Sequence, residues 1–144
     1  MKISDTIIRV RYAETDQMGI VYHTNYIIWF EIGRTDWFRQ IGQDYKTLEE
    51  KNILLPVIGV NCKYKKSALY DDPVIIRTYL KELKGVRLTF HYEILRKEDE
   101  ELLAEGETQH AFVDKNQKPI PLKKRFPEIW KILQNNMAVS YTHL

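Results

Sequence analysis

The chain has 144 residues, of which 44% are hydrophobic and 29% are charged. This length supports one sizeable hydrophobic core and is too short for two, so we expect a single domain over residues 1–134. The net charge of +2, from 22 basic and 20 acidic residues, excludes the strongly basic surface on which nonspecific nucleic-acid binding depends. Residues 135–144 lack periodicity, and we expect an irregular tail there that is disordered or derived from an expression vector.

The single cysteine of the chain, Cys62, cannot form an intrachain disulfide. Residues 1–5 are partly charged and lack the apolar core of a signal peptide. Both features favour a reducing, cytoplasmic location. Apolar runs stay well below the roughly 20 residues that span a bilayer, so no transmembrane segment is expected.

The first half of the chain predicts a strand, a loop and a long helix. Residues 6–12 are β-branched, aromatic and partly alternating, which is typical of a strand, and residues 13–22 read as a loop. The helix then begins with Thr24 or Asn25 as its N-cap and ends just before Gly42. Its first half is apolar on nearly all faces, so we expect the rest of the fold to enclose it.

The second half of the chain changes to strand periodicity. Residues 74–81 and 86–94 alternate apolar and polar side chains, as half-buried strands do, and Lys84-Gly85 marks the turn between them. Residues 102–113 complete a meander, and residues 123–133 form a basic amphipathic segment that predicts a helix. This order indicates an α+β domain, either a curved antiparallel sheet wrapped around the helix or a plain two-layer sandwich.

Asp16 lies just ahead of the long helix, across a turn that Gly19 makes possible. Unpaired backbone N–H groups in the first helical turn, near Tyr22, His23 and Thr24, can bind a developing oxyanion. A carboxylate held across a bound thioester carbonyl can attack that carbonyl or deprotonate a water molecule. The alternative is that Asp16 only closes an Asx-turn in the loop.

Four segments of the chain resemble the signature of the 4-hydroxybenzoyl-CoA thioesterase family. They read YAETDQMGIVYHTNY at 12–26, WFE at 29–31 followed by Arg34, PVIGVN at 56–61 and ALYDD at 68–72. The similarity extends over residues 7–127 in the expected order, and a motif of that length is specific. Val21-Tyr22-His23 is similar to the branch of short- and medium-chain acyl-CoA thioesterases that is associated with the Tol-Pal cell-envelope genes.

The resemblance implies the hotdog fold, in which a curved antiparallel sheet wraps around one long central helix, and hydrolysis of an acyl-CoA thioester. It implies that Asp16 is the nucleophile or general base, that the backbone N–H of His23 polarises the carbonyl, and that the side chains of Tyr22 and His23 take part. It also implies homodimers or homotetramers whose active sites lie between subunits.

Further candidate substrate contacts are Gly19, Tyr26, Trp29 and Asn61. Tyr26 and Trp29 have a simpler interpretation as core residues of the enclosed helix. His23 likewise has two interpretations, because a histidine side chain can act as acid or base near neutral pH but its backbone donor alone can also suffice.

Coenzyme A carries a phosphorylated nucleotide, so cationic side chains are expected where it binds. The available clusters are Lys84, Arg87, Lys123, Lys124 and Arg125. Each of these side chains can equally be an ordinary solvated charge at a turn or on a terminal helix.

Other chemistries lack their motifs in this chain. There is no Gly-x-Ser-x-Gly and no phosphate loop, and His91, His110 and His143 show no zinc spacing with one another or with Cys62. We therefore expect an enzyme that needs no metal and no redox cofactor. Two other functions stay open: a hotdog dehydratase or hydratase acting on acyl thioesters, and a noncatalytic scaffold that binds acyl-CoA or acyl carrier protein.

Overall fold

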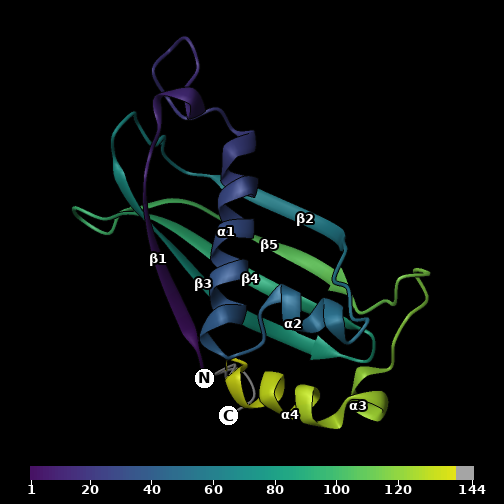
Figure 1. Cartoon of the computed structure of the whole chain (residues 1–144). Helices are drawn as coiled ribbons and strands as arrows, with labels where there is room; N and C mark the ends of the chain where they lie inside the picture. The colour runs from purple at the N-terminus through teal and green to yellow at the C-terminus, as the bar shows by residue number, and fades with distance from the viewer. Residues whose placement is uncertain (139–144) are drawn as a thin grey trace.

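The computed structural model describes residues 1–138. The elements follow in the order β1 (Ile3–Arg9), a 3-10 turn η1 (Tyr12–Glu14), α1 (Thr24–Gln40), α2 (Tyr45–Glu50), β2 (Val57–Tyr64), β3 (Pro73–Lys84), β4 (Arg87–Arg96), β5 (Leu102–Ala111), α3 (Leu122–Arg125) and α4 (Pro127–Asn136). The five strands form one antiparallel sheet in the order β1-β3-β4-β5-β2, and α1 lies across one face of it (Figure 1). The expected α+β hotdog arrangement, a curved sheet around a long helix, is confirmed.

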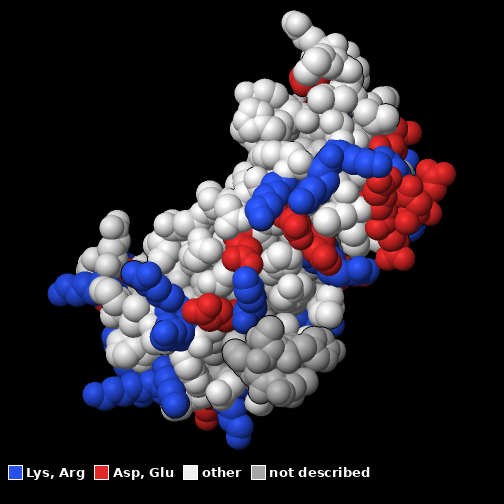
Figure 2. All heavy atoms as spheres, turned by 180° about the vertical axis from the view of Figure 1, so that it is seen from behind, with Lys and Arg blue, Asp and Glu red and all other residues white. Residues whose placement is uncertain are grey.

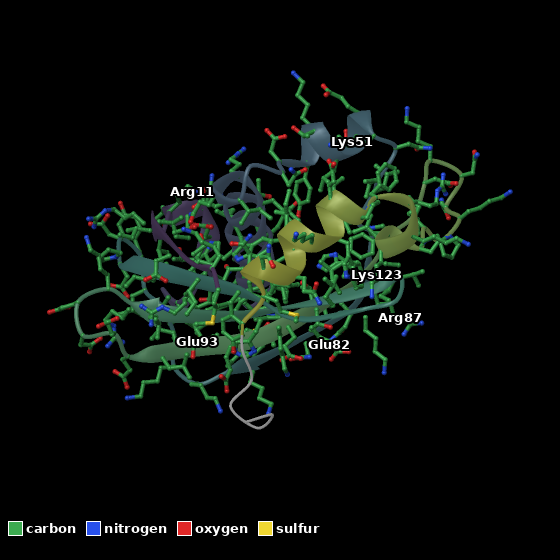
Figure 3. All side chains as sticks on the ribbon, turned by 90° about the horizontal axis from the view of Figure 1, so that it is seen from below. Arg11, Lys51, Glu82, Arg87, Glu93 and Lys123 are labelled. Atoms are coloured by element: carbon green, nitrogen blue, oxygen red, sulfur yellow. The ribbon has the colours of Figure 1, made fainter. Side chains whose placement is uncertain are left out.

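The sheet separates an inner face, which packs against α1, from an outer face on the other side. Inner side chains such as Ile76, Phe90 and Tyr92 are completely buried, because successive residues of a strand point to opposite faces. The outer face carries the charged residues between them, among them Glu93, which points away from the helices in Figure 3. Seen from behind in Figure 2, acidic side chains gather at the right edge and basic side chains at the lower left, with both kinds side by side between them.

Helix α1 packs closely on β3 at Gly33. A Cβ atom at this position would collide with the side chains of Thr78 and Ile76, both of which are fully buried. The absence of a side chain at Gly33 therefore sets how near the helix lies to the sheet. The prediction that the rest of the fold encloses this helix holds for only part of its surface, because Ile28 and Ile32 remain exposed.

The structure differs from the sequence predictions mainly at element ends. Strand β1 lies three residues nearer the N-terminus than expected, at Ile3–Arg9. Pro127 divides the predicted terminal helix, because proline has no N–H and disfavours helical geometry at the residue before it. Helix α4 then runs to Asn136, past the expected domain boundary at residue 134. Residues 139–144, the rest of the expected irregular tail, lie outside the described residues.

Within residues 1–138, no helix is both long enough and apolar enough to cross a membrane.

Candidate active site at the start of α1

The loop that carries Asp16 is a tight hydrogen-bonded turn. The backbone N–H of Asp16 donates to the carbonyl of Ile20 at 2.8 Å, and the N–H of Gly19 donates to the carbonyl of Asp16 at 3.0 Å. Gly19 has a φ of +79°, in the left-handed region that residues with a Cβ adopt at a cost. The expected role of Gly19 in the backbone turn is therefore confirmed.

The Asp16 side chain uses only one of its two oxygens inside the turn. Oδ1 accepts the backbone N–H of Met18 at 2.8 Å, so the Asx-turn considered from the sequence does form. Among residues 1–138, no side chain or backbone group donates a hydrogen bond to Oδ2. The carboxylate is half-buried, which leaves this second oxygen available to a substrate or a water molecule.

Glu14 attaches the Asp16 turn to the central helix, a role that the sequence reasoning missed. Its side chain is 5% exposed. Oε1 accepts the backbone N–H of Arg11 at 2.8 Å, and Oε2 accepts the indole N–H of Trp29 at 2.8 Å. Its carbonyl oxygen also accepts the N–H of Tyr22 at 2.8 Å and the side-chain amide of Asn25 at 2.9 Å. One buried residue thus fixes the end of the turn and the beginning of α1.

The donors at the helix start are fewer than expected. The N–H of Tyr22 is already bonded to Glu14, whereas the N–H of His23 has no acceptor among the residues that the structure describes. The carbonyl oxygen of His23 accepts the hydroxyl of Tyr64 at 3.0 Å, which ties the helix start to β2. Because α1 begins at Thr24, its N-cap residue is His23 and not the expected Thr24 or Asn25.

A cleft of about 300 Å³ opens beside the helix start. It is lined by Ile20, Val21, His23, Tyr26, Tyr64, Lys65, Lys66 and Ser67. Tyr26 therefore lines the cleft although its side chain is mostly buried, whereas Trp29 is wholly in the core, one of the two interpretations that the sequence left open. Asp16 lies outside this lining, on the neighbouring turn.

Lys65 and Lys66 are cations that the sequence reasoning did not consider. Both side chains are exposed at the edge of the cleft and form ion pairs with β5 or with the residue just before it, Lys65 with Glu105 at 4.0 Å and Lys66 with Glu101. Both lysines line the same cleft as His23 at the start of α1. No local sequence pattern indicates this arrangement, because only the fold brings residues 65–67 beside His23.

Tyr64 and Cys62, beside the cleft, are neutral at physiological pH. Partial burial, together with the neighbouring Cys62 thiol, raises the pKa of Tyr64 to about 12, so Tyr64 acts as a hydroxyl donor. Burial also raises the pKa of the Cys62 thiol, which opposes thiolate formation and agrees with the expectation that Cys62 is a strand residue and no nucleophile.

His110 belongs to the core. Its Nε2 lies 2.7 Å from the Thr108 hydroxyl and its Nδ1 lies 3.1 Å from the carbonyl oxygen of Leu55, so both ring nitrogens are engaged. Burial, and then the charge of nearby Arg34, lower the pKa of His110 to about 4. His110 is a neutral structural side chain.

Asn61 lies away from the cleft. It stands on β2 opposite Glu107 of β5, on the outer face of the sheet. Within one chain it therefore does not meet the other candidate substrate contacts.

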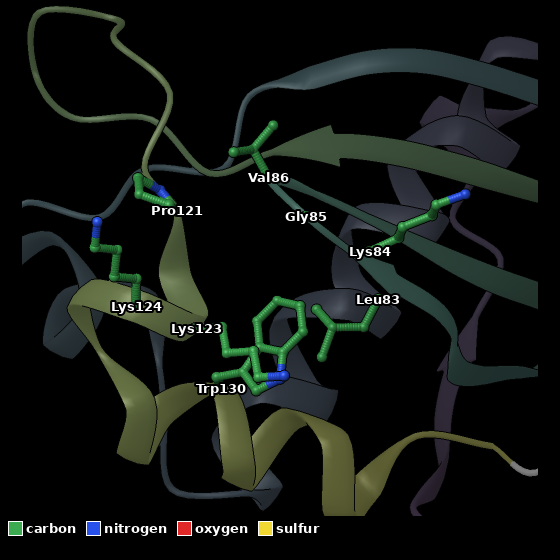
Figure 4. Close-up of a pocket in the computed structure, with 8 residues that line it drawn as sticks. All are labelled: Leu83, Lys84, Gly85, Val86, Pro121, Lys123, Lys124 and Trp130. Atoms are coloured by element: carbon green, nitrogen blue, oxygen red, sulfur yellow. The ribbon is translucent and has the colours of Figure 1, made fainter.

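The cations expected to bind the nucleotide lie at the end of the sheet that is far from Asp16. The start of β3 pairs with the end of β1 near the Asp16 turn, so the β3–β4 turn is at the far end of the sheet. Around that turn is a cavity of about 730 Å³, lined by Leu83, Lys84, Gly85, Val86, Pro121, Lys123, Lys124 and Trp130 (Figure 4). Arg87 begins β4 beside this cavity, and Arg125 lines a different one next to Pro127.

Comparisons with known proteins identify the family. Residues 10–133 match the model of the thioesterase-like superfamily, and the chain belongs to that superfamily. It is 40% identical over 129 residues to a putative acyl-CoA thioesterase, YneP, of Bacillus subtilis, which covers 89% of this chain and 93% of that protein. It is 31% identical over 119 residues to the acyl-CoA thioesterase YbgC of Haemophilus influenzae, covering 81% of this chain and 86% of that one.

Solved structures agree with this assignment. A DHNA-CoA thioesterase from Staphylococcus aureus superposes with a TM-score of 0.87 at 36% identity, covering 94% of this chain and 91% of the other. The predicted hotdog thioesterase family is confirmed.

Replacing Glu14 with glutamine should destabilise the fold and slow catalysis. Both carboxylate oxygens accept N–H groups, and an amide leaves one of these buried donors unpaired, which costs about 1–3 kcal/mol. Urea unfolding measures the loss, and turnover of acyl-CoA reports the loosened turn. Glu98→Gln, at an exposed position in the β4–β5 turn, is the control and should stay within about 0.5 kcal/mol of the parent. Equal stabilities for the two variants would show that Glu14 does not brace the site.

Proposed function

We propose that the chain hydrolyses an acyl-CoA thioester to a carboxylic acid and free CoA, with Asp16 as its catalytic carboxylate. Membership of the thioesterase superfamily and the names of the relatives support the reaction. The observation that carries the role of Asp16 is its placement: a half-buried carboxylate with one unused oxygen, held on a rigid turn next to the start of α1.

The helix start supplies the donor for the thioester oxygen. The N–H of His23 has no acceptor among residues 1–138, and the aligned peptides of α1 add a positive potential at this end. A thioester carbonyl bound there would be polarised, and the negative charge that develops on its oxygen would be stabilised.

Asp16 can then act in either of two ways. As a nucleophile, its free oxygen attacks the carbonyl carbon, the carbon–sulfur bond breaks, CoA leaves as the thiolate, and water hydrolyses the resulting mixed anhydride. As a general base, it takes a proton from a water molecule that attacks the same carbon. Both routes give the same products. The side chains of Tyr22 and His23, whose rings lie 4.6 Å apart at the start of α1, are the candidates to assist either route.

We further propose that the active site is completed by a second copy of the chain, in a homodimer or homotetramer. Asp16 lies outside the lining of the cleft in one chain. Strand β2 is an edge of the sheet, and its residues Val57, Ile58 and Val60 are about half exposed. Ile28 and Ile32 on α1 are also exposed. An unpaired edge with apolar side chains is protected when another chain covers it.

Asp16→Asn should lower kcat by roughly 10²–10⁴-fold, the range for losing a general base, or further if attack is covalent. The amide keeps the shape and the Asx-turn acceptor, so the urea unfolding curve should stay close to that of the parent. Release of free thiol from acyl-CoA measures the rate, with Glu98→Gln as the matched carboxylate control. Turnover by Asp16→Asn at the parent rate would remove Asp16 from the mechanism.

The nucleotide of CoA should contact the cluster of Lys84, Arg87, Lys123, Lys124 and Arg125. Because this cluster is far from Asp16 of the same chain, the proposal requires that it serve a site shared between subunits. Changing Lys84, Lys123 and Lys124 to glutamine should raise KM for acyl-CoA and leave KM for acyl-pantetheine unchanged. The matched variant changes Lys65 and Lys66 to glutamine. If only that variant raises KM, the nucleotide lies beside the start of α1 and the cluster has no role in binding it.

Sedimentation should show no folded monomer at micromolar concentration. Val60→Lys places a charge on the exposed edge strand, where it should oppose association and lower activity together. The control places a lysine at another exposed position, Gln134→Lys on α4, which is away from both the edge strand and the proposed active site. Thr24 is exposed as well but is unsuitable as a control, because a lysine at the start of α1 could disturb catalysis directly. A stable, active monomer would contradict the shared site.

A further inference from the structure

The outer face of the sheet brings a histidine and two glutamates together at its centre. His91 and Glu93 are two residues apart on β4, and Glu105 stands directly opposite Glu93 on β5. A ring nitrogen of His91 and one carboxylate oxygen of each glutamate all lie within 4.8 Å of one another. All three side chains are partly buried, which limits the conformations that they can adopt.

The His91 ring is held with one nitrogen facing the two carboxylates. Its Nδ1 lies 3.2 Å from Oε2 of Glu107, and because a carboxylate only accepts, Nδ1 is the donor. In the neutral ring Nε2 therefore carries the lone pair, and Nε2 is the nitrogen that faces Glu105, at 4.0 Å. Tyr79 stacks on the ring at a centroid distance of 5.0 Å and fixes its plane.

Glu107 is itself held as an ionised acceptor. The ammonium of Lys81 donates to the same Oε2 at 2.6 Å. A carboxylate that orients the far nitrogen of an imidazole is the usual partner of a metal-binding histidine in proteins.

Glu93 and Glu105 form a like-charge pair on a face whose other charges are mostly neutralised. Directly opposite like charges destabilise a sheet. Arg77 stands directly opposite Glu93 on β3, but its guanidinium forms a bidentate bond to Asp5 at 2.9 Å instead. Within residues 1–138, Glu93 forms no ion pair, and the only lysine paired with Glu105 is the exposed Lys65, at 4.0 Å. A cation between the two glutamates would relieve this repulsion.

We propose that His91, Glu93 and Glu105 bind one divalent transition-metal ion on the outer face of the sheet. Imidazole with carboxylate oxygens suits zinc, which takes ligands at about 2.0–2.2 Å and so places them about 3.4 Å apart. The three ligand atoms, which lie within 4.8 Å of one another here, would move closer by rotation of their side chains when the ion binds. The ion links β4 to β5 and leaves at least one coordination position to water or to another ligand.

This site is distinct from the proposed active site, although one ion pair connects the two: Lys65, which lines the cleft, pairs with Glu105 at 4.0 Å. The cleft at the start of α1 lies on the other side of the sheet, and none of its lining residues belongs to the trio. Sequence spacing gave no signal for the site, because Glu105 reaches His91 only through the pairing of β4 with β5. The proposal departs from the expectation of an enzyme without a metal, which rested on the absence of zinc spacing among the histidines and Cys62.

Zinc binding to the purified full chain, followed by calorimetry, tests the proposal. One ion per chain is expected, and saturating zinc should raise the midpoint of thermal unfolding by several degrees. Glu93→Gln and Glu105→Gln should each weaken binding by at least about tenfold. Glu107→Gln should weaken it by a similar factor, because an amide oxygen is a weaker acceptor for the His91 N–H than a carboxylate. Glu98→Gln, an exposed carboxylate on the following turn, should bind zinc as the parent does.

The competing explanation is that a protonated His91 simply bridges Glu105 and Glu107 without a metal. Absence of zinc binding at millimolar concentration, or binding that none of the three glutamine variants weakens, would overturn the proposal. Without metal, Glu93→Gln should be at least as stable as the parent, because it removes a repulsion. A variant that lost zinc binding only because it failed to fold would be recognised by circular dichroism, and Glu105→Gln then provides the second, independent test.

Discussion

The arrangement at the start of α1 depends on the buried carboxylate of Glu14. It bonds the indole of Trp29, a side chain in the centre of the core, and the backbone of Arg11 at the beginning of the loop. The backbone carbonyl oxygen of Glu14 accepts the N–H of Tyr22, the residue that precedes the N-cap. These bonds therefore tie the Asp16 turn to the buried core of the molecule. Burying a charged carboxylate is costly, and its full set of N–H partners offsets that cost.

The long helix and the meander could be predicted because each leaves a periodic pattern in the sequence. The alternation in β3 and β4 assigns Ile76 and Phe90 to the inner face and Glu93 to the outer one, as found. The turn glycine of the site was also predictable, because Gly19 adopts positive φ. Element ends were less accurate, and Pro127 was a visible signal for the break before α4 that was not used.

The contacts that complete the site could not be predicted, because they join residues that are distant in the chain. Tyr64 and Lys65 reach His23 only after β2 has paired with β5. The same holds for the His91 and Glu105 pair on the outer face. The predicted nucleotide cluster shows the same limit: Lys84 and Lys123 are close to each other, but at the end of the sheet that is far from Asp16 of the same chain. Composition identified the cations and gave no information on their position.

The most direct test of the account is release of free thiol by the unmodified protein from a panel of acyl-CoAs, running from acetyl to palmitoyl and including aryl-CoAs. The account predicts steady turnover of at least one member, with a carboxylic acid as the second product and no change in enoyl absorbance when crotonyl-CoA is supplied. Hydration of crotonyl-CoA without thiol release would indicate a hydratase. Tight binding of acyl-CoA without turnover of any member would indicate a scaffold, and either result would contradict thioester hydrolysis at Asp16.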